Sequence, residues 1–266
     1  MTMPTPYLDV NVVLDVLLSS VRDVLGDCFV GLYLYGSLAS GDFDPLRSDI
    51  DFVVVTTAEL PAEMINAVEM MHVSLAASDL KWMPKLEGTY IPQSALRRYD
   101  PNAALCPCLN EGRFYLARHE SDWVIQRTIL REHGVVVAGP SIQPMIDPVE
   151  PDDIRHGVRR VLRGWWTALL DNPSWLRDDE YQAYAVLTMC RALYTLQHGA
   201  IASKPVSARW ALAELDQRWA ALIDWAITWQ RADQTDRLTE TLEFIRCTLR
   251  LSVQSDLSAA QQGESS

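Results

Sequence analysis

The sequence is short of basic residues, and this shortage limits the partners that the protein can bind. Its 266 residues include 23 Lys and Arg against 35 Asp and Glu, which gives a formal net charge of −12. Nucleic-acid phosphates are neutralised by clustered Lys and Arg, so this balance excludes nucleic-acid binding through a broad basic face. An acidic surface attracts cations instead, and it would steer a small polycationic substrate toward an acidic cleft.

Long apolar runs are missing as well. No stretch approaches the length that a helix needs to span a bilayer, and the start, Met-Thr-Met-Pro-Thr-Pro, lacks the basic and apolar regions of an export signal. The five cysteines, an odd number, argue against a disulfide framework and for a reducing compartment. Cys106 and Cys108 have no second Cys or His pair at ligand spacing, so we expect loop thiols rather than half of a metal site. The sequence therefore predicts a cytoplasmic protein without a membrane partner.

The hydrophobic pattern divides the chain into a mixed half and a helical half. The first half has helical spacing at 7–25, 60–76 and 122–132, and apolar runs typical of strands at 29–35, 50–56, 86–91 and 135–138. Residues 93–121 show no regular pattern, and three prolines between 141 and 151 indicate a linker. Beyond the linker the pattern is helical at 152–170, 179–198, 205–228 and 235–253. The Ser-, Gln- and Gly-rich residues 254–266 are expected to be a disordered tail.

Two of the expected strands flank a motif that suits a phosphate and metal site. Gly36 lets the backbone approach a ligand closely, and Ser37 offers a hydroxyl and an N–H at the start of a short helix. Asp49 and Asp51 open the strand 50–56, where a period of two puts both on one face. Such carboxylates repel each other unless a cation lies between them, and Mg²⁺ prefers hard oxygen ligands and shares substrate phosphates. The alternative is a β-hairpin with a solvated acidic loop.

Glu87 is a lone carboxylate in apolar company within the expected strand 86–91. A carboxylate is unusual in a buried strand unless it faces a cation or a substrate. We therefore expect Glu87 to face a cation or a substrate. The rival acids lie on or near the expected helix 60–76 and are interpreted as solvated: Glu59, Glu63, Glu69 and Asp79.

The order strand, Gly-Ser, turn, Asp-x-Asp, strand resembles the signature of the nucleotidyltransferase superfamily of the polymerase-β type. Further segments resemble the aminoglycoside (3″)(9) adenylyltransferases, which confer streptomycin and spectinomycin resistance. These segments are Arg131–Pro140, Asp147–Val149, Val186–Tyr194, Gly199–Lys204 and Ala208–Ala211. The resemblance spans residues 8–253 and implies an α+β protein. Residues 1–150 would form a nucleotidyltransferase domain with a mixed sheet flanked by helices, and residues 151–253 a C-terminal all-α bundle domain that helps to hold the substrates.

The same resemblance implies roles for individual residues. Asp49, Asp51 and Glu87 would hold two Mg²⁺ ions, and Glu87 would also be the general base. The implied ATP-binding residues are Gly36, Ser37, Ser48, Asp122, Arg191 and Lys204. Asp178 and Asp179 fall near the antibiotic-binding acids of the family, although their alternative role is simply to cap the helix 179–198.

The implied reaction is the transfer of AMP from ATP to a hydroxyl of a cationic aminoglycoside or aminocyclitol by a monomeric enzyme. Two features on the acceptor side depart from the streptomycin-modifying relatives. Residues 99–121 contain no Trp, and the segment before Tyr181 is a few residues longer. The acceptor therefore stays open. The alternatives are the same chemistry on another hydroxylated metabolite or a protein side chain, or a non-catalytic nucleotide-binding module, against which the intact acids argue.

Overall fold

The computed structural model describes residues 3–120, 123–230 and 235–263. Its chain divides into two compact units, Met1–Val149 and Glu150–Ser266. The division lies inside the proline-rich segment 141–151 that the sequence indicated as a linker, and the assignment of separate domains stays a prediction. Each unit buries apolar side chains of its own.

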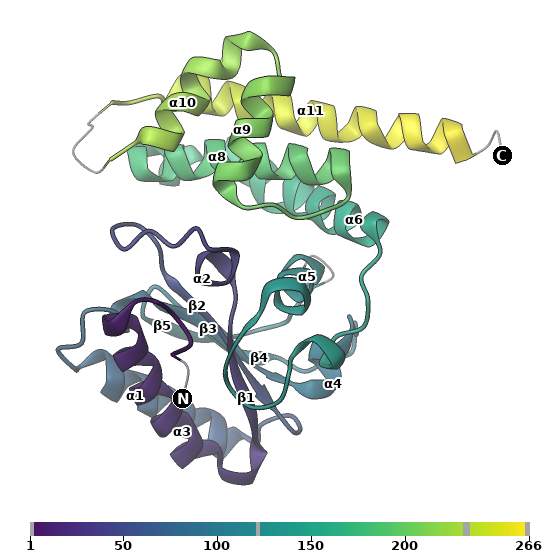
Figure 1. The fold of residues 1–266 in the computed structure, drawn as a ribbon. Coiled ribbons are helices and arrows are strands. Elements are labelled where there is room, and N and C mark those ends of the chain that lie inside the picture. Colours follow the sequence, from purple (N-terminus) through teal and green to yellow (C-terminus); the bar gives the residue numbers. More distant parts are fainter. Residues whose placement is uncertain (1–2, 121–122, 231–234, 264–266) are drawn as a thin grey trace. The chain divides into compact units, whose positions relative to one another are not determined.

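The first unit is built on a mixed sheet with the strand order β5-β4-β3-β2-β1-β6 (Figure 1). β2 and β3 run parallel, and the other neighbouring pairs of the sheet are antiparallel. With helices on both faces, this sheet confirms the predicted fold class. The strands are β1 (Phe29–Leu34), β2 (Ile50–Thr56), β3 (Leu86–Pro92), β4 (Cys106–Asn110), β5 (Arg113–Ala117) and β6 (Val135–Ala138).

Helices α1 (Leu8–Leu25) and α3 (Ala62–Ala76) cover one face of the sheet (Figure 1). Their apolar residues recur at helical spacing, so each helix has one side to bury. These side chains pack against alternate strand residues of the same face, among them Leu32, Phe52 and Tyr90. A fully buried side chain of this size contributes about 1.5–3 kcal/mol, so this apolar core stabilises the sheet.

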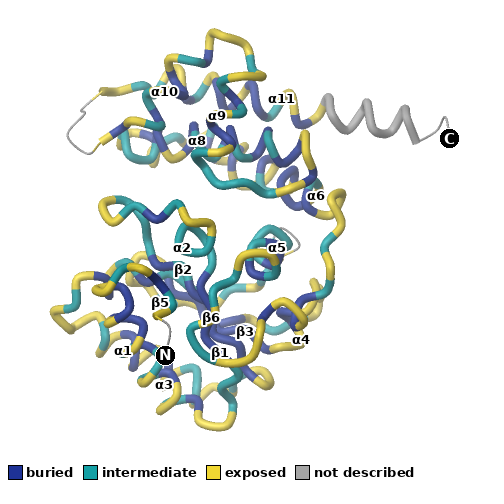
Figure 2. Tube along the Cα trace, viewed as in Figure 1, coloured by how far each residue is buried: buried dark blue, intermediate teal, exposed yellow. Residues whose placement is uncertain are grey.

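The opposite face has a smaller core, formed with α4 (Gln93–Arg97) and α5 (Val124–His133). It contains the strand residues that alternate with the first set, such as Val53 and Ile91. Figure 2 shows the buried residues concentrated along the strands of this unit. Because side chains alternate along a strand, Asp51 lies on the same face as Val53, at the start of β2. On this face, the smaller apolar core therefore ends where the candidate acids begin.

The region 93–121 contains α4, β4 and β5, so its interpretation as irregular is wrong. β4 and β5 form a hairpin in which Asn110 pairs with Arg113. The two turn residues, Glu111 and Gly112, have φ values of 48° and 72°, as the two-residue turns of twisted hairpins require. Each strand has only five residues, too few for a periodic signal to stand out from a loop.

Cys106 and Cys108 also differ from the expectation of loop thiols, because both are buried in β4. Burial raises the pKa of the Cys106 thiol to about 12. Burial likewise raises the pKa of Cys108. Both therefore stay protonated at neutral pH and behave as small apolar residues of the sheet.

The second unit consists of helices that pack around α8 (Asp179–His198). α8 contacts α6 (Pro151–Val161), α9 (Lys204–Glu214), α10 (Ala220–Thr228) and α11 (Leu238–Gly263). Neighbours on several sides explain why buried residues occur along almost the whole length of α8. The predicted all-helical second half is therefore confirmed.

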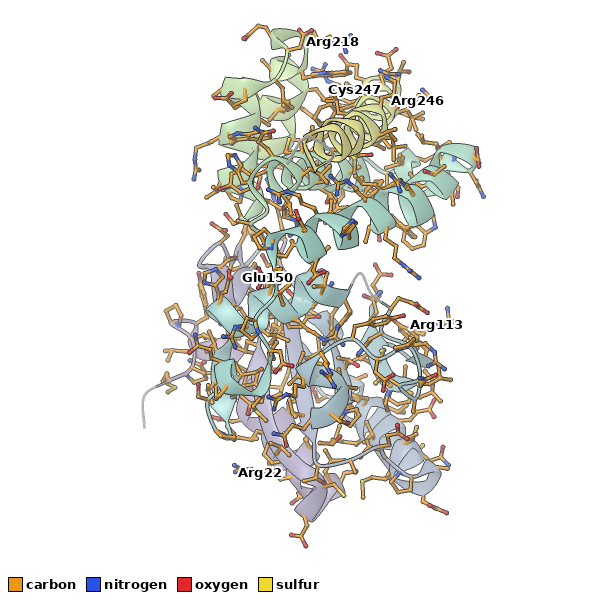
Figure 3. The ribbon with its side chains drawn as sticks, turned by 90° about the vertical axis from the view of Figure 1, so that its right-hand side faces the viewer. Arg22, Arg113, Glu150, Arg218, Arg246 and Cys247 are labelled. Atoms are coloured by element: carbon orange, nitrogen blue, oxygen red, sulfur yellow. The ribbon has the colours of Figure 1, made fainter. Side chains whose placement is uncertain are left out.

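The single helix predicted at 205–228 is interrupted. α9 ends at Glu214, and Asp216 begins a new turn because its carboxylate accepts a hydrogen bond from Arg218 N at 3.0 Å. Arg218 also reaches α11, where its Nη2 lies 3.9 Å from Cys247 Sγ (Figure 3). A side-chain cap of this kind competes with a continuing helix, and hydrophobic spacing alone does not reveal it.

Two other helices differ in detail from the prediction. The helix expected at 152–170 widens into a π-helical turn at Leu162–Trp166 before α7 (Thr167–Asp171). α11 continues to Gly263 rather than ending at Val253, so the expected tail is helical up to that residue. Among the helices of the described residues, none is long and apolar enough to cross a bilayer.

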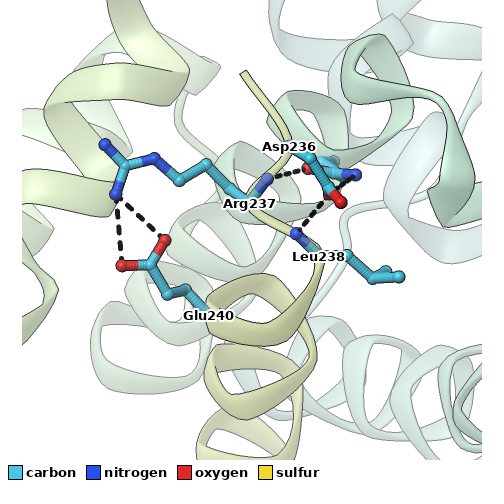
Figure 4. A network of polar contacts seen from close by, with 5 residues as sticks. Asp236, Arg237, Leu238 and Glu240 are labelled. Carbon is cyan, nitrogen blue, oxygen red and sulfur yellow. Dashed lines mark hydrogen bonds and ion pairs between the residues drawn. The ribbon is translucent and has the colours of Figure 1, made fainter.

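A polar network fixes the start of α11 (Figure 4). The Asp236 carboxylate accepts hydrogen bonds from Leu238 N and from Gln182 Nε2, both at 2.9 Å. Gln182 Oε1 in turn accepts one from Arg237 N at 2.7 Å, and Arg237 Nη1 lies 3.0 and 3.1 Å from the two Glu240 oxygens. Since Gln182 is fully buried in α8, these bonds satisfy its amide and join the two helices.

The buried His72 on α3 is expected to make the unfolding free energy depend on pH. Its Nε2 lies 2.8 Å from Tyr90 OH, and burial lowers its pKa from 6.5 to about 4. The unfolded chain binds a proton at this residue below about pH 6.5, whereas the folded chain does so only below about pH 4. The contribution of His72 to the unfolding free energy is therefore fully present above pH 6.5, and it is lost as the pH falls toward 4. Between pH 7 and 5 we expect a loss of about 2 kcal/mol from this group.

Urea unfolding at pH 7 and pH 5 measures this loss in the wild type and in His72→Phe. The variant keeps an aromatic ring in the core but cannot be protonated there. Its unfolding free energy should therefore fall less between the two pH values, whatever its stability at pH 7. Equal losses in both proteins would show that His72 does not couple protonation to folding.

Candidate functional site

The turn after β1 brings the backbone against one of the candidate carboxylates. Gly36 begins the short helix α2 (Gly36–Ser40) with a φ of 62°, which glycine adopts without strain. A Cβ on Gly36 would lie 1.9 Å from Asp51 Oδ2. The Asp51 carbonyl also accepts a hydrogen bond from Tyr35 N at 3.1 Å. Only glycine therefore allows the turn and the Asp51 carboxylate to lie this close together.

Asp51 and Glu87 are direct neighbours across the parallel strands β2 and β3. The register pairs these two residues, and neighbouring strands lie about 4.8 Å apart. Paired residues of a parallel ladder project from the same face, so the two side chains stand side by side. The third acid that the sequence predicted is thus next to one member of the first pair.

The environment of Glu87 favours its protonated form more than water does. Burial raises its pKa to about 7, and the negative charges of Asp49 and Glu111 act in the same direction. Lys85 and a backbone hydrogen bond from Glu111 oppose this rise in pKa. A carboxyl group with a pKa near neutrality can accept and release a proton at working pH, as a general base must.

Asp49 forms an ion pair with Lys85, whose Nζ lies 2.8 Å from Asp49 Oδ1. Their side chains are 35% and 43% exposed, so water screens the pair. The sequence analysis did not identify Lys85. Lys85 ends the 3₁₀ turn Met83–Lys85 that precedes β3, so no strand or helix period marked it in the sequence. The Lys85 ammonium group neutralises part of the negative charge of the neighbouring acids.

The three acids do not form a ready-made metal site in this structure. Nowhere in the described part of the chain are three acidic, histidine or cysteine side chains gathered closely enough to hold a metal ion. Asp49 is engaged with Lys85, whereas Asp51 and Glu87 stand together. The donors nevertheless fit Mg²⁺, because they are carboxylate oxygens whose mutual repulsion a cation would relieve. Mg²⁺ also needs few protein ligands when phosphate oxygens and water complete its shell.

Two further neighbours of Glu87 escaped the sequence analysis. Burial and the charges of Asp51 and Glu87 raise the pKa of Tyr35 well above its usual value, so its hydroxyl stays protonated beside the acids. Asn110, in the amide orientation that satisfies the group, directs Nδ2 at both Glu87 oxygens, at 3.2 and 3.1 Å. Tyr35 ends an apolar run, and Asn110 falls in the region without a regular pattern. The only signal for Asn110 is the Asn-x-Gly sequence of its turn.

The two predicted serines lie on either side of the turn that connects β1 and β2. Ser37 is in α2, and its carbonyl accepts a hydrogen bond from Asp42 N at 3.0 Å. Ser48 Oγ accepts one from Asp44 N, also at 3.0 Å. The Ser48 hydroxyl therefore holds the turn in shape, and its contact with a nucleotide stays a prediction, as does that of Ser37.

The other nucleotide-binding candidates lie elsewhere in the chain. Asp122 is outside the described residues, so its predicted role is not tested. Arg191 lies on α8 and is partly buried. Lys204 is the first residue of α9, and its Nζ lies 4.5 Å from the centre of the Tyr184 ring. The roles of Arg191 and Lys204 in ATP binding stay predictions.

Asp178 and Asp179 open α8 in the second unit. Asp178 is the N-cap, and its Oδ1 accepts a hydrogen bond from Glu180 N at 2.9 Å. Asp179 follows in the first turn, where a negative charge complements the helix dipole. Capping thus accounts for Asp178, and antibiotic binding by either residue stays a prediction.

Two family models match the chain in the order of its two units. Residues 18–98 match the model described as Nucleotidyltransferase domain, and residues 144–254 match the model described as Aminoglycoside adenylyltransferase, C-terminal domain. The first match contains Gly36, Asp49, Asp51 and Glu87, and the second contains most of the helical unit.

Curated relatives align with most of the chain. An aminoglycoside (3″)(9) adenylyltransferase of Escherichia coli is 27% identical over 219 residues, which cover 79% of this chain and 80% of the relative. A spectinomycin 9-adenylyltransferase of Staphylococcus aureus is 26% identical over 230 residues, covering 83% and 85%. A solved structure of a spectinomycin adenyltransferase from Enterococcus faecialis, with ATP and spectinomycin, is 18% identical. It superposes with a TM-score of 0.69 and covers 90% of this chain and 98% of that one, so the fold is shared.

Proposed function

Because the chain belongs to the aminoglycoside adenylyltransferase family, we propose that it transfers AMP from ATP to a hydroxyl group of an aminoglycoside or aminocyclitol antibiotic. The observation that carries this proposal is the pairing of Asp51 with Glu87 across parallel strands, directly against the Gly36 turn. The relatives are named for action on aminoglycosides or on spectinomycin. A net charge of −12 also suits a cationic acceptor.

In the proposed reaction, Glu87 accepts the proton of the acceptor hydroxyl. At the same time the oxygen of that hydroxyl attacks the α-phosphorus of ATP. The bond between that phosphorus and the oxygen bridging to the β-phosphate breaks, and pyrophosphate leaves. The half-buried position of Glu87 and its pKa near 7 support this role. Mg²⁺ would be held by Asp49, Asp51 and Glu87, and when bound it would neutralise charge on the triphosphate.

We assign the remaining predicted residues to binding. Gly36, Ser37 and Ser48, with Asp122, would contact the nucleotide. The close approach of the Gly36 backbone to Asp51 supports this assignment, because a phosphate bound there would lie near the acids. Asp178 and Asp179 carry the charge that an ammonium-bearing antibiotic requires, but Asp178 is already occupied as a helix cap.

Arg191→Ala and Lys204→Ala are each expected to weaken ATP binding. A charge-assisted hydrogen bond to a phosphate contributes about 1.5–3 kcal/mol, so the dissociation constant should rise by about tenfold or more. Titration calorimetry with ATP and Mg²⁺ measures this change. Arg209→Ala, at an exposed position of α9, is the control and should bind ATP like the wild type. Unchanged ATP affinity in both test variants would confine nucleotide binding to the first unit.

The function itself is tested by incubating the protein with ATP, Mg²⁺ and a panel of aminoglycosides and aminocyclitols. Mass spectrometry should detect an antibiotic that has gained AMP, with release of pyrophosphate. Streptomycin and spectinomycin belong in the panel because the relatives act within this class. If ATP is bound but no antibiotic on the panel gains AMP, the acceptor assignment is wrong. Labelled ATP would then be used to search other hydroxylated metabolites.

A further inference from the structure

The tip of the β4–β5 hairpin has an unusual backbone conformation. Glu111 is the one non-glycine residue of the described chain with a positive φ, 48°. This region costs an L-residue roughly 1–2 kcal/mol, and the usual occupant of such a turn position is Asn, Asp or Gly. Strain of this kind persists where surrounding contacts fix it, often beside functional groups.

Residues of this turn form hydrogen bonds with the Glu87 carboxylate. In the amide orientation that satisfies its hydrogen bonds, Asn110 places Nδ2 3.2 and 3.1 Å from the two Glu87 oxygens. The backbone of Glu111 also forms a hydrogen bond with the same carboxylate. Adjacent residues of one hairpin therefore hold a carboxylate on β3, the strand that pairs with β4 through Gly88 and Leu109.

We propose that Asn110 is a positioning residue for the AMP transfer, because its amide holds the Glu87 carboxylate in a fixed orientation toward the acceptor hydroxyl. This inference rests on the proposed function and adds a residue to it. A carboxylate next to like charges would otherwise rotate to lessen repulsion. Two hydrogen bonds from one planar amide restrict that rotation, and the hairpin turn keeps the amide in place.

Asn110→Ala and Asn110→Asp test the proposal. The first removes the donor, and the second keeps the size of the side chain but replaces the donor with an acceptor. We expect kcat to fall by about 10- to 100-fold in Asn110→Ala, the usual cost of a misplaced reacting group, and at least as much in Asn110→Asp. The KM values for ATP and acceptor should stay within about twofold of the wild type, because Asn110 holds the base and not the substrates.

Leu116→Ala is the matched control within the same hairpin. Leu116 is 45% exposed, and it lies on the face of β5 opposite to Tyr115 and Glu87. Removing its side chain therefore loosens the hairpin without changing a contact of Glu87. Its kcat should equal that of the wild type, and melting temperatures of all variants should be measured beside it. A merely structural role for Asn110 would lower the melting temperature and leave kcat of the folded enzyme intact, which would overturn the proposal. A raised acceptor KM with normal kcat would also overturn it, by assigning Asn110 to acceptor binding.

A spectroscopic test does not depend on activity. The chain has five asparagines, so selective ¹⁵N labelling gives few side-chain amide signals, and Asn110→Ala identifies the one of interest. Glu87→Ala should shift the Asn110 amide signal, whereas Glu63→Ala, on the exposed first turn of α3, should not. An unmoved signal would refute the contact. If the wild type transfers AMP to no acceptor while the signal moves, the proposed function fails and the contact stands.

Discussion

Replacing Asp51 with asparagine is expected to abolish AMP transfer while the protein stays folded. Asp51 stands beside Glu87 in the β2–β3 register, and its Oδ2 would lie 1.9 Å from a Cβ on Gly36. Asparagine fits the same space, so the turn and the strand pairing should be kept. The change removes a proposed Mg²⁺ ligand and a negative charge next to another carboxylate. We therefore expect product below detection by mass spectrometry and a melting temperature equal to or above that of the wild type.

Asp49→Asn should also abolish transfer, but its effect on stability should differ because it breaks the ion pair with Lys85. Asp23→Asn, at an exposed position of α1, is the control for the loss of one carboxylate anywhere on the protein. Wild-type turnover in Asp51→Asn or Asp49→Asn would remove that residue from the metal assignment. Loss of activity accompanied by a sharp drop in melting temperature would instead indicate a structural role.

Glu87→Gln is expected to lower kcat by about 10²–10⁴-fold, the usual contribution of a general base. Glutamine keeps the size of the side chain but cannot accept the proton of the acceptor hydroxyl. ATP affinity should change little, because Asp49 and Asp51 remain to bind the metal with the triphosphate. The decisive measurements are the ATP dissociation constant and the single-turnover rate on one preparation of the variant.

The alternative role of Glu87 gives a different result. If Glu87 were only a metal ligand, Glu87→Gln would weaken Mg²⁺-dependent ATP binding. Glu69→Gln changes a rival acid on an exposed position of α3 and should behave like the wild type. A normal chemical rate together with normal ATP affinity in Glu87→Gln would place the third acid elsewhere in the chain.

The local parts of the site could be predicted from the sequence because they depend on neighbouring residues. The apolar runs gave β1 and β2 nearly to the residue. Asp51 lies within β2, whereas Asp49 precedes the strand and pairs with Lys85, so their common face stays a prediction. Glu87 stood out for a similar reason, as a charge within an apolar strand. Which member of the first pair it stands beside did not follow from the sequence, because the pairing of β2 with β3 joins residues that α3 separates in the chain.

Residues that act through side-chain contacts were harder to find. Lys85 and Asn110 touch the acids from segments without a strong periodic signal. The β4–β5 hairpin was missed because its strands are short and its turn has Glu in place of the usual Asn or Gly at the first position. The break after α9 was missed for the same kind of reason, since the cap at Asp216 is a single side-chain hydrogen bond.

The parallel pairing of β2 with β3 has a consequence for the evolution of this enzyme. The spacing between Asp51 and Glu87 is set by backbone hydrogen bonds of the ladder, which most side chains permit. Surface residues can therefore be exchanged without moving the two acids apart. A new acceptor could be gained by changes in loops and exposed helix positions while the reacting geometry is inherited. Under antibiotic selection, adaptation to a new drug should thus spare positions 36, 51 and 87 and accumulate elsewhere.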